Sequence, residues 1–218
     1  ACLVYATECN IGALVNALDE LEFLENTLIS FMSGNGQSQE TKYRISVDNH
    51  LSGYPKGHFY GASGGGFTGK WTGQKGTFLE GGIRVPAILR YPSKIPQGET
   101  RDQIITAMDW LPTVMDLCGI KKQDGDPRLD GHSLLPVIEN PYQMSGYQKI
   151  LNFQWHKSWA VRMDEWKLIG REGSEKIQLY RLTDQEPERK NYSSERNDIV
   201  EGMLAMRKAW LDDVNKTK

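Results

Sequence analysis

The feature that most constrains the fold is a change of sequence pattern near Gly146. Before this point, helical and strand patterns alternate along the chain. Apolar residues between Val4 and Leu21 recur at spacings of three, four and seven, which predicts a helix. Apolar runs at Leu28–Met32 and Arg84–Tyr91 predict strands, and Met108–Cys118 again has a helical pattern. This alternation predicts an α/β domain with a mostly parallel sheet over residues 1–145.

After Gly146 the chain changes to short strand patterns separated by charged turns. The predicted strands are Lys149–Trp155, Trp159–Ile169 and Ile177–Leu182. Ile199–Val214 has apolar residues on one helical face, so an amphipathic helix is expected there. Residues 146–218 are therefore predicted to form a small subdomain in which a helix covers an antiparallel sheet.

Composition excludes two classes of partner. The net charge is −2 and the basic residues are scattered, so no nucleic-acid partner is expected. No apolar stretch approaches the roughly 20 residues that span a bilayer, so no membrane span is expected either. The chain has no initiator Met and begins within a helical pattern, so we expect a fragment of a longer protein. The sequence leaves the oligomeric state open.

The stretch from Gln37 to Gly73 has no sustained periodicity and is rich in Gly, Ser and Tyr. A structureless loop of this length is unusual inside a domain. It is either a functional loop or contains a small hairpin near Tyr43–Val47.

Five motifs resemble those of the sulfatase family, in the family's order along the chain. The most informative, at Gln74–Pro86, is similar to "GKGTxxEGGxRxP". The others are Asn26–Gly36 ("NTLIxFTSDNG"), Thr106–Thr113 ("TxMDxxPT"), Leu129–Pro136 ("LDGxSLLP") and Trp159–Leu168 ("xAVRxGxWKL"). The resemblance implies the C-terminal part of a sulfuric ester hydrolase of the arylsulfatase-like, formylglycine-dependent type. The implied fold is α/β, an alkaline-phosphatase-like mixed sheet flanked by helices, followed by the small antiparallel sheet plus helix.

Lys75 is the strongest candidate for a catalytic and substrate-binding residue. When a sulfate ester is cleaved at its S–O bond, negative charge grows on the bridging oxygen, and a fixed ammonium group stabilises it. The resemblance gives Lys75 contact with the substrate sulfate; the alternative is a solvated lysine in a Gly-rich turn. His58 lies in the poorly matched loop and is a weaker substrate-binding candidate. Glu80 and Arg84 are expected to be structural, as a pair or as partners of backbone amides.

The turn at Gly34-Asn35 is the candidate metal site. The family has an Asp-Asn pair here, whose oxygens bind a divalent cation, usually calcium, and hard cations favour such ligands. Gly34 replaces the expected Asp, so the resemblance implies a weakened calcium site that keeps Asn35. Asp48, in the dipeptide Asp48-Asn49, is either a displaced substitute ligand or part of a solvated turn.

The nucleophile motif of the family, "C/S-x-P/A-x-R", is absent from this sequence. None of the three cysteines, Cys2, Cys9 and Cys118, lies in it. Formylglycine is therefore expected upstream of this chain, and the chain alone is expected to be inactive. The alternatives are a non-catalytic sulfatase-like protein that binds sulfated glycans or a partner, and a phosphatase or phosphodiesterase relative. The resemblance implies a sulfated small molecule or glycan as substrate, and a secreted, periplasmic or lysosomal location.

Overall fold

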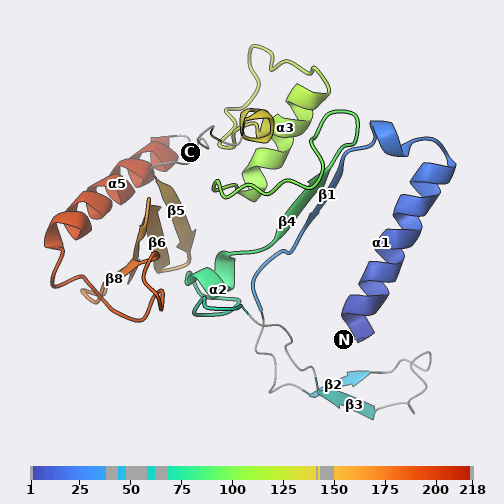
Figure 1. Ribbon diagram of the computed structural model, residues 1–218. Coiled ribbons are helices and arrows are strands. Elements are labelled where there is room, and N and C mark those ends of the chain that lie inside the picture. The colour runs from blue at the N-terminus through green and yellow to red at the C-terminus, as the bar shows by residue number, and fades with distance from the viewer. Residues whose placement is uncertain are drawn as a thin grey trace. The chain divides into compact units, whose positions relative to one another are not determined.

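The structure is a computed structural model that describes residues 2–37, 44–47, 58–61, 68–140, 142 and 150–216 (Figure 1). Of residues 2–3, 44–47 and 58–61 only the backbone is described. The chain forms two units, one made of residues 1–32 and 87–148 and the other of residues 33–86 and 149–218. The second unit thus joins the glycine-rich middle of the chain to its C-terminal part. A boundary between residues 145 and 146 stays a prediction.

The first unit contains three α-helices, two 3₁₀ turns and two strands among its described residues. They are α1 (Cys2–Glu20), η1 (Leu24–Asn26), β1 (Ile29–Met32), β4 (Ala87–Arg90), η3 (Ala107–Asp109), α3 (Trp110–Leu117) and α4 (Leu135–Glu139). The helix expected from Val4 to Leu21 is present. Its apolar residues Val4, Leu14 and Leu21 are exposed in the described part of the chain.

The two strands of this unit pair antiparallel, with Met32 opposite Ala87 and Ile29 opposite Arg90. The expectation of parallel pairing is wrong for these two strands. Met32 ends β1 and Ala87 begins β4. Because these two residues lie opposite each other, the two strands run in opposite directions. Phe31 is 41% exposed, so β1 is half-buried rather than fully buried.

A buried aspartate joins two of the sequence motifs in the first unit. Asp109 is fully buried, and its carboxylate accepts hydrogen bonds from the backbone N–H groups of Thr106 (2.6 Å) and His132 (2.8 Å). Thr113 donates to the Asp109 carbonyl and accepts from the Leu134 N–H. These contacts tie the start of α3 to the turn that precedes α4, so both motifs have a structural role here.

The second unit contains a hairpin, a short helix, a four-stranded sheet and a long helix. They are β2 (Arg44–Val47) with β3 (His58–Gly61), α2 (Glu80–Ile83), β5 (Leu151–Trp155), β6 (Ser158–Met163), β7 (Trp166–Arg171), β8 (Gln178–Arg181) and α5 (Asn197–Lys216). The antiparallel order β5-β6-β7-β8 confirms the predicted meander, and the β2–β3 hairpin agrees with the hairpin alternative near Tyr43–Val47. The predicted strand Trp159–Ile169 is two strands, because Asp164 adopts a φ of 49° in a turn between them.

One face of the β5–β8 sheet packs against α5, as predicted for the amphipathic helix (Figure 1). Trp159, Val161 and Leu168 from the sheet meet Val200 and Met203 from the helix, all with less than a tenth of their surface exposed. Burial of these large apolar side chains stabilises the unit. No helix among the described residues is long and apolar enough to cross a bilayer.

Candidate functional site

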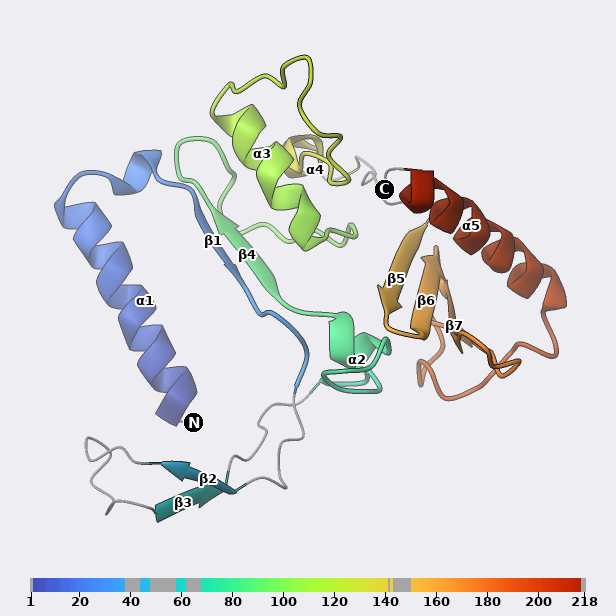
Figure 2. The same cartoon turned by 180° about the vertical axis from the view of Figure 1, so that it is seen from behind.

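The second face of the β5–β8 sheet, opposite α5, carries a different set of side chains. Residues in register on this face include Arg162 opposite Lys167, and Lys167 opposite Tyr180. The same alternation places Phe153, Trp155, Ser158, Ile169 and Gln178 on this face. The loop from Gly76 to Ile83, which contains α2, lies against part of it, so α2 and α5 lie on opposite sides of the sheet (Figure 2).

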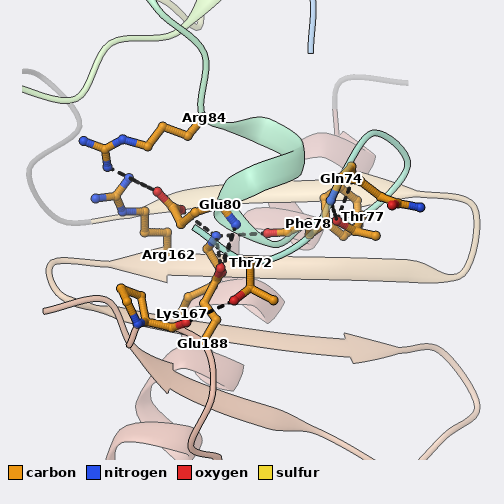
Figure 3. A network of polar contacts seen from close by, with 10 residues as sticks. Thr72, Gln74, Thr77, Phe78, Glu80, Arg84, Arg162, Lys167 and Glu188 are labelled. Carbon is orange, nitrogen blue, oxygen red and sulfur yellow. Dashed lines mark hydrogen bonds and ion pairs between the residues drawn. The ribbon is translucent and has the colours of Figure 1, made fainter. Parts of the chain in front are cut away.

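Lys167 is the centre of a buried ionic cluster on this face (Figure 3). Its side chain has no exposed surface, and Glu80 and Glu188 are 1% and 5% exposed. The Lys167 ammonium lies 2.5 Å from Glu80 Oε1 and 3.0 Å from Glu188 Oε1, and it donates to the Phe78 carbonyl at 3.0 Å. The Glu80 N–H donates to both Glu188 carboxylate oxygens at 2.9 and 3.0 Å. Three segments far apart in sequence are therefore held at one buried point.

Arginines complete the cluster around Glu80. The guanidinium groups of Arg84 and Arg162 lie 3.4 and 3.7 Å from Glu80 Oε2 (Figure 3). The pairing of Glu80 with Arg84 agrees with the structural role expected for both. Arg84 also stacks over Trp71, 4.4 Å from the ring centre, so Trp71 is packed against the loop.

The two buried carboxyls respond to this environment in opposite directions. Burial raises the pKa of Glu188, and the nearby Lys167 charge only partly offsets that effect. Burial alone would also raise the pKa of Glu80, but Lys167, Arg162 and Arg84 together outweigh it and lower the pKa below its usual value. Glu188 also has a φ of 62°, a left-handed backbone that glutamate rarely adopts. The contacts of the cluster hold Glu188 in this strained backbone conformation.

The loop that carries Lys75 is bonded to the turn that carries Asn35. The Lys75 N–H donates to the Gln37 carbonyl at 2.8 Å, and the Gly36 N–H donates to the Gly82 carbonyl at 2.9 Å. A side chain at Gly36 would overlap the carbonyl of Gly81, so this close approach requires glycine. The sequence motifs around Asn35 and Lys75 thus form one structural element.

Thr77 stabilises the turn from Gln74 to Thr77, which contains Lys75. Its hydroxyl donates to the Gln74 carbonyl at 2.8 Å and accepts from the Gln74 N–H at 3.2 Å (Figure 3). Gly76, with a φ of 86°, allows the chain to reverse there. Lys75 is exposed beside this turn, on a backbone fixed by hydrogen bonds on both sides.

A groove of about 860 Å³ lies between this element and the sheet face. Its walls are the Gly34-Asn35 turn, the loop from Gly76 to Ile83, and the sheet residues Trp155, Ser158, Ile169, Gly170 and Gln178. Asn35 and Gly76, the residue that follows Lys75, therefore line the same groove. The groove is open to solvent along part of its length.

The donor set at the candidate metal turn does not make a calcium site by itself. Asn35 offers one amide oxygen, and its Nδ2 donates to the Gly36 carbonyl at 2.7 Å. No three His, Cys, Asp or Glu side chains of the described ranges gather where they could hold a metal ion. An added Cβ at Gly34 meets nothing within 4 Å, so the missing carboxylate leaves space rather than a filled position.

The other predicted site residues are placed only in part. His58 lies in β3 opposite Val47, and its side chain is not among those described. Asp48 lies outside the described residues. Their suggested roles stay predictions.

Sequence reasoning missed Lys167, Glu188 and Trp155. Lys167 stands in the apolar run Trp166-Lys167-Leu168-Ile169, and a lysine within a buried strand pattern indicates a buried ion pair. That signal was available, although the partners Glu80 and Glu188 could not be found from sequence spacing. Trp155 was assigned only to a strand, and its exposure of 59% is visible only in the structure.

Two family models match this chain. One, described as "Sulfatase", matches residues 3–120. The other, described as "N-sulphoglucosamine sulphohydrolase, C-terminal", matches residues 70–213. The second match covers both the Lys75 loop and the β5–β8 sheet.

Named relatives agree with these matches. Steryl-sulfatase of Homo sapiens is 35% identical over 144 residues, which are 66% of this chain and 22% of that protein. N-acetylgalactosamine-6-sulfatase of Canis lupus familiaris is 32% identical over 129 residues, 59% of this chain and 21% of that protein. The chain thus spans about a fifth of the length of these curated relatives.

The fold also matches solved structures. The structure of Ps i-CgsB in complex with k-i-k-neocarrahexaose superimposes with a TM-score of 0.69 and 27% identity, over 95% of this chain and 41% of that one. The phosphonate monoester hydrolase SpPMH from Silicibacter pomeroyi superimposes with a TM-score of 0.59 at 16% identity, a likeness of fold alone.

Proposed function

Because this chain belongs to the sulfatase family, we propose that it is the C-terminal part of a sulfuric ester hydrolase in which Lys75 contacts the sulfate group. The sulfate ester loses its alcohol by S–O cleavage, and inorganic sulfate is released. Negative charge builds on the bridging oxygen as that bond breaks, and the Lys75 ammonium stabilises it. An interaction that is strongest at this stage accelerates the reaction more than it tightens substrate binding.

The observation that carries this proposal is the pair of backbone hydrogen bonds from Lys75 to Gln37 and from Gly36 to Gly82. These hydrogen bonds hold Lys75 close to the turn that carries Asn35, at the edge of one groove. A charge acts most strongly on a developing anion when its position is fixed in advance. The buried Lys167 cluster provides that fixation, since Lys167 binds Phe78 and Glu80 within the same loop.

The covalent step requires a nucleophile that lies outside the motifs of this chain. Formylglycine, formed from a cysteine or serine in the family motif, supplies the attacking group when it is present. We therefore propose that the chain alone binds sulfate groups without turning over a sulfate ester. Asn35 would contribute one neutral ligand to a calcium ion, and a complete site would need anionic ligands from elsewhere.

A second candidate function is non-catalytic binding of sulfated glycans or of a partner. Gly34 favours it, because an active site of this family uses an aspartate at that position. The substrate class is a proposal in either case, a sulfated small molecule or a glycan. Steryl-sulfatase is named for a steroid ester, whereas Ps i-CgsB was solved with an oligosaccharide. We also propose a secreted, periplasmic or lysosomal location for the protein.

The test is a titration of the purified chain with sodium sulfate, followed by calorimetry or by amide chemical shifts. Lys75→Ala should weaken binding at least about tenfold, because one hydrogen bond to a charged group is lost. Lys122→Ala, at an exposed lysine of the first unit, is the matched control and should bind as the wild type does. An aryl sulfate added to the same sample should not be hydrolysed. Equal sulfate affinity in Lys75→Ala and wild type would contradict the assignment of Lys75.

A further inference from the structure

The loop covers only half of the sheet face that lies opposite α5. Over that half, Glu80 meets Lys167 and Arg162, and Phe78 packs 6.0 Å from Phe153, ring centre to ring centre. The other half forms the groove wall with Trp155, Ser158, Ile169 and Gln178. This half of the face faces the groove rather than protein.

The side chains of the uncovered half combine one large aromatic surface with polar groups. Trp155 is 59% exposed at the end of β5, directly opposite Ser158. Its indole meets the His156 ring edge-on at 4.9 Å, which restricts how the indole can turn. Among the described residues, the Ser158 hydroxyl and the Gln178 amide make no hydrogen bond, so both are available to a ligand.

We propose that this surface, with Trp155 as its platform, binds the sugar ring of a sulfated saccharide whose sulfate group lies at Lys75. The inference rests on the proposed function and adds to it that the alcohol part of the sulfate ester is a sugar. The apolar C–H face of a pyranose stacks on the indole, while its hydroxyl groups bond to Ser158 and Gln178. A platform held in place before binding costs less entropy to order when the ligand arrives.

The shape of the groove favours a saccharide over a steroid. Sites for apolar small molecules enclose 70–90% of the ligand surface in general. This groove is partly open, and Trp155 and Gln178 in its wall are exposed. A sugar keeps its outer hydroxyl groups in water there, whereas a steroid would leave apolar surface exposed, at a cost proportional to that area.

The test compares four probes on the full 218-residue chain by calorimetry: N-acetylglucosamine 6-sulfate, N-acetylglucosamine, estrone sulfate and inorganic sulfate. Trp155→Ala should weaken binding of the sulfated sugar by about tenfold, the size of one aromatic stacking contact. Trp155→Phe should restore most of it. Tyr142→Ala, at a residue that is 91% exposed, is the control and should have no effect. Inorganic sulfate should bind Trp155→Ala and wild type equally.

The outcomes separate the two proposals. If inorganic sulfate binds through Lys75 but the sulfated sugar binds no better than sulfate, the saccharide surface is wrong and the proposed function stands. Estrone sulfate binding more tightly than the sulfated sugar, with loss in Trp155→Ala, would replace the saccharide by an apolar ligand. If inorganic sulfate does not bind, or binds independently of Lys75, the proposed function fails and this inference fails with it.

Discussion

Replacing Lys167 with methionine removes the cation from a buried cluster while keeping a side chain of similar length. The ammonium has three oxygen partners, at 2.5 Å on Glu80, 3.0 Å on Glu188 and 3.0 Å on the Phe78 carbonyl. Without it, the Glu188 carboxylate, which is 5% exposed, loses its cationic partner, and the Glu80 carboxylate, which is 1% exposed, keeps Arg84 and Arg162 at 3.4 and 3.7 Å. Breaking a buried pair in this way costs about 3–5 kcal/mol, a large part of the 5–15 kcal/mol that stabilises a typical domain.

The assay is urea unfolding at pH 7 followed by tryptophan fluorescence, because Trp159 and Trp166 lie in the core of the same unit. With an m-value of about 2 kcal/mol/M, the unfolding midpoint of Lys167→Met should fall by about 1.5–2.5 M. Lys190→Met is the control, since Lys190 pairs with Glu195 on the surface, where both side chains are 54% exposed. Its midpoint should not move measurably.

The deficit of Lys167→Met should also shrink as the pH falls. The Glu188 carboxyl, which loses its cationic partner in this variant, can take up a proton in the folded state, which removes the buried charge. Measurements at pH 7 and near pH 4.5 distinguish loss of charge from loss of packing. A midpoint shift no larger than that of Lys190→Met, or one independent of pH, would refute the reasoning.

Four further outcomes are expected. Gly36→Ala should lower the free energy of unfolding by about 1–3 kcal/mol, because its Cβ overlaps backbone, whereas Gly34→Ala, with open space around it, should not. Burial raises the pKa of Glu188, so its ionisation costs stability above pH 4.5; relative to wild type, Glu188→Gln should therefore gain stability from pH 4.5 to pH 7. Relative to wild type, Glu80→Gln should lose stability as the pH rises to 4.5 and show no further trend above it, since a lowered pKa contributes stability that is lost as pH falls below 4.5. Gly34→Asp adds a carboxylate beside Asn35, so excess calcium should raise the melting temperature of this variant more than that of wild type, and EDTA should reverse the gain.

Periodicity was sufficient for the elements that have one strongly patterned face. The helices α1 and α5 and the meander follow from apolar spacing within one segment. Spacing could not show that β1 and β4 pair antiparallel, because the direction depends on where the chain re-enters after residues 33–86. It also missed the turn at Asp164, since strand-forming residues continue on both sides of it.

Site residues that lie within one sequence motif could be predicted, whereas contacts between segments distant in sequence could not. Lys75 and Asn35 were selected from local motifs. The Lys167 cluster joins residues 108 positions apart, Glu80 and Glu188, and no local pattern links them. Trp155 lies in β5, and the exposure of its side chain depends on how far the loop from Gly76 to Ile83 covers the sheet.

The most direct measurement of the central claim is steady-state kinetics of Lys75→Ala in a protein that joins this chain to a formylglycine-bearing N-terminal sulfatase part. Lys122→Ala serves as the control. The account predicts that kcat for sulfate ester hydrolysis falls about 100- to 1,000-fold, a larger change than the roughly tenfold rise in KM from the lost sulfate contact, because the ammonium meets charge that is greatest in the transition state. A kcat equal to that of the control, or a loss confined to KM, would contradict it.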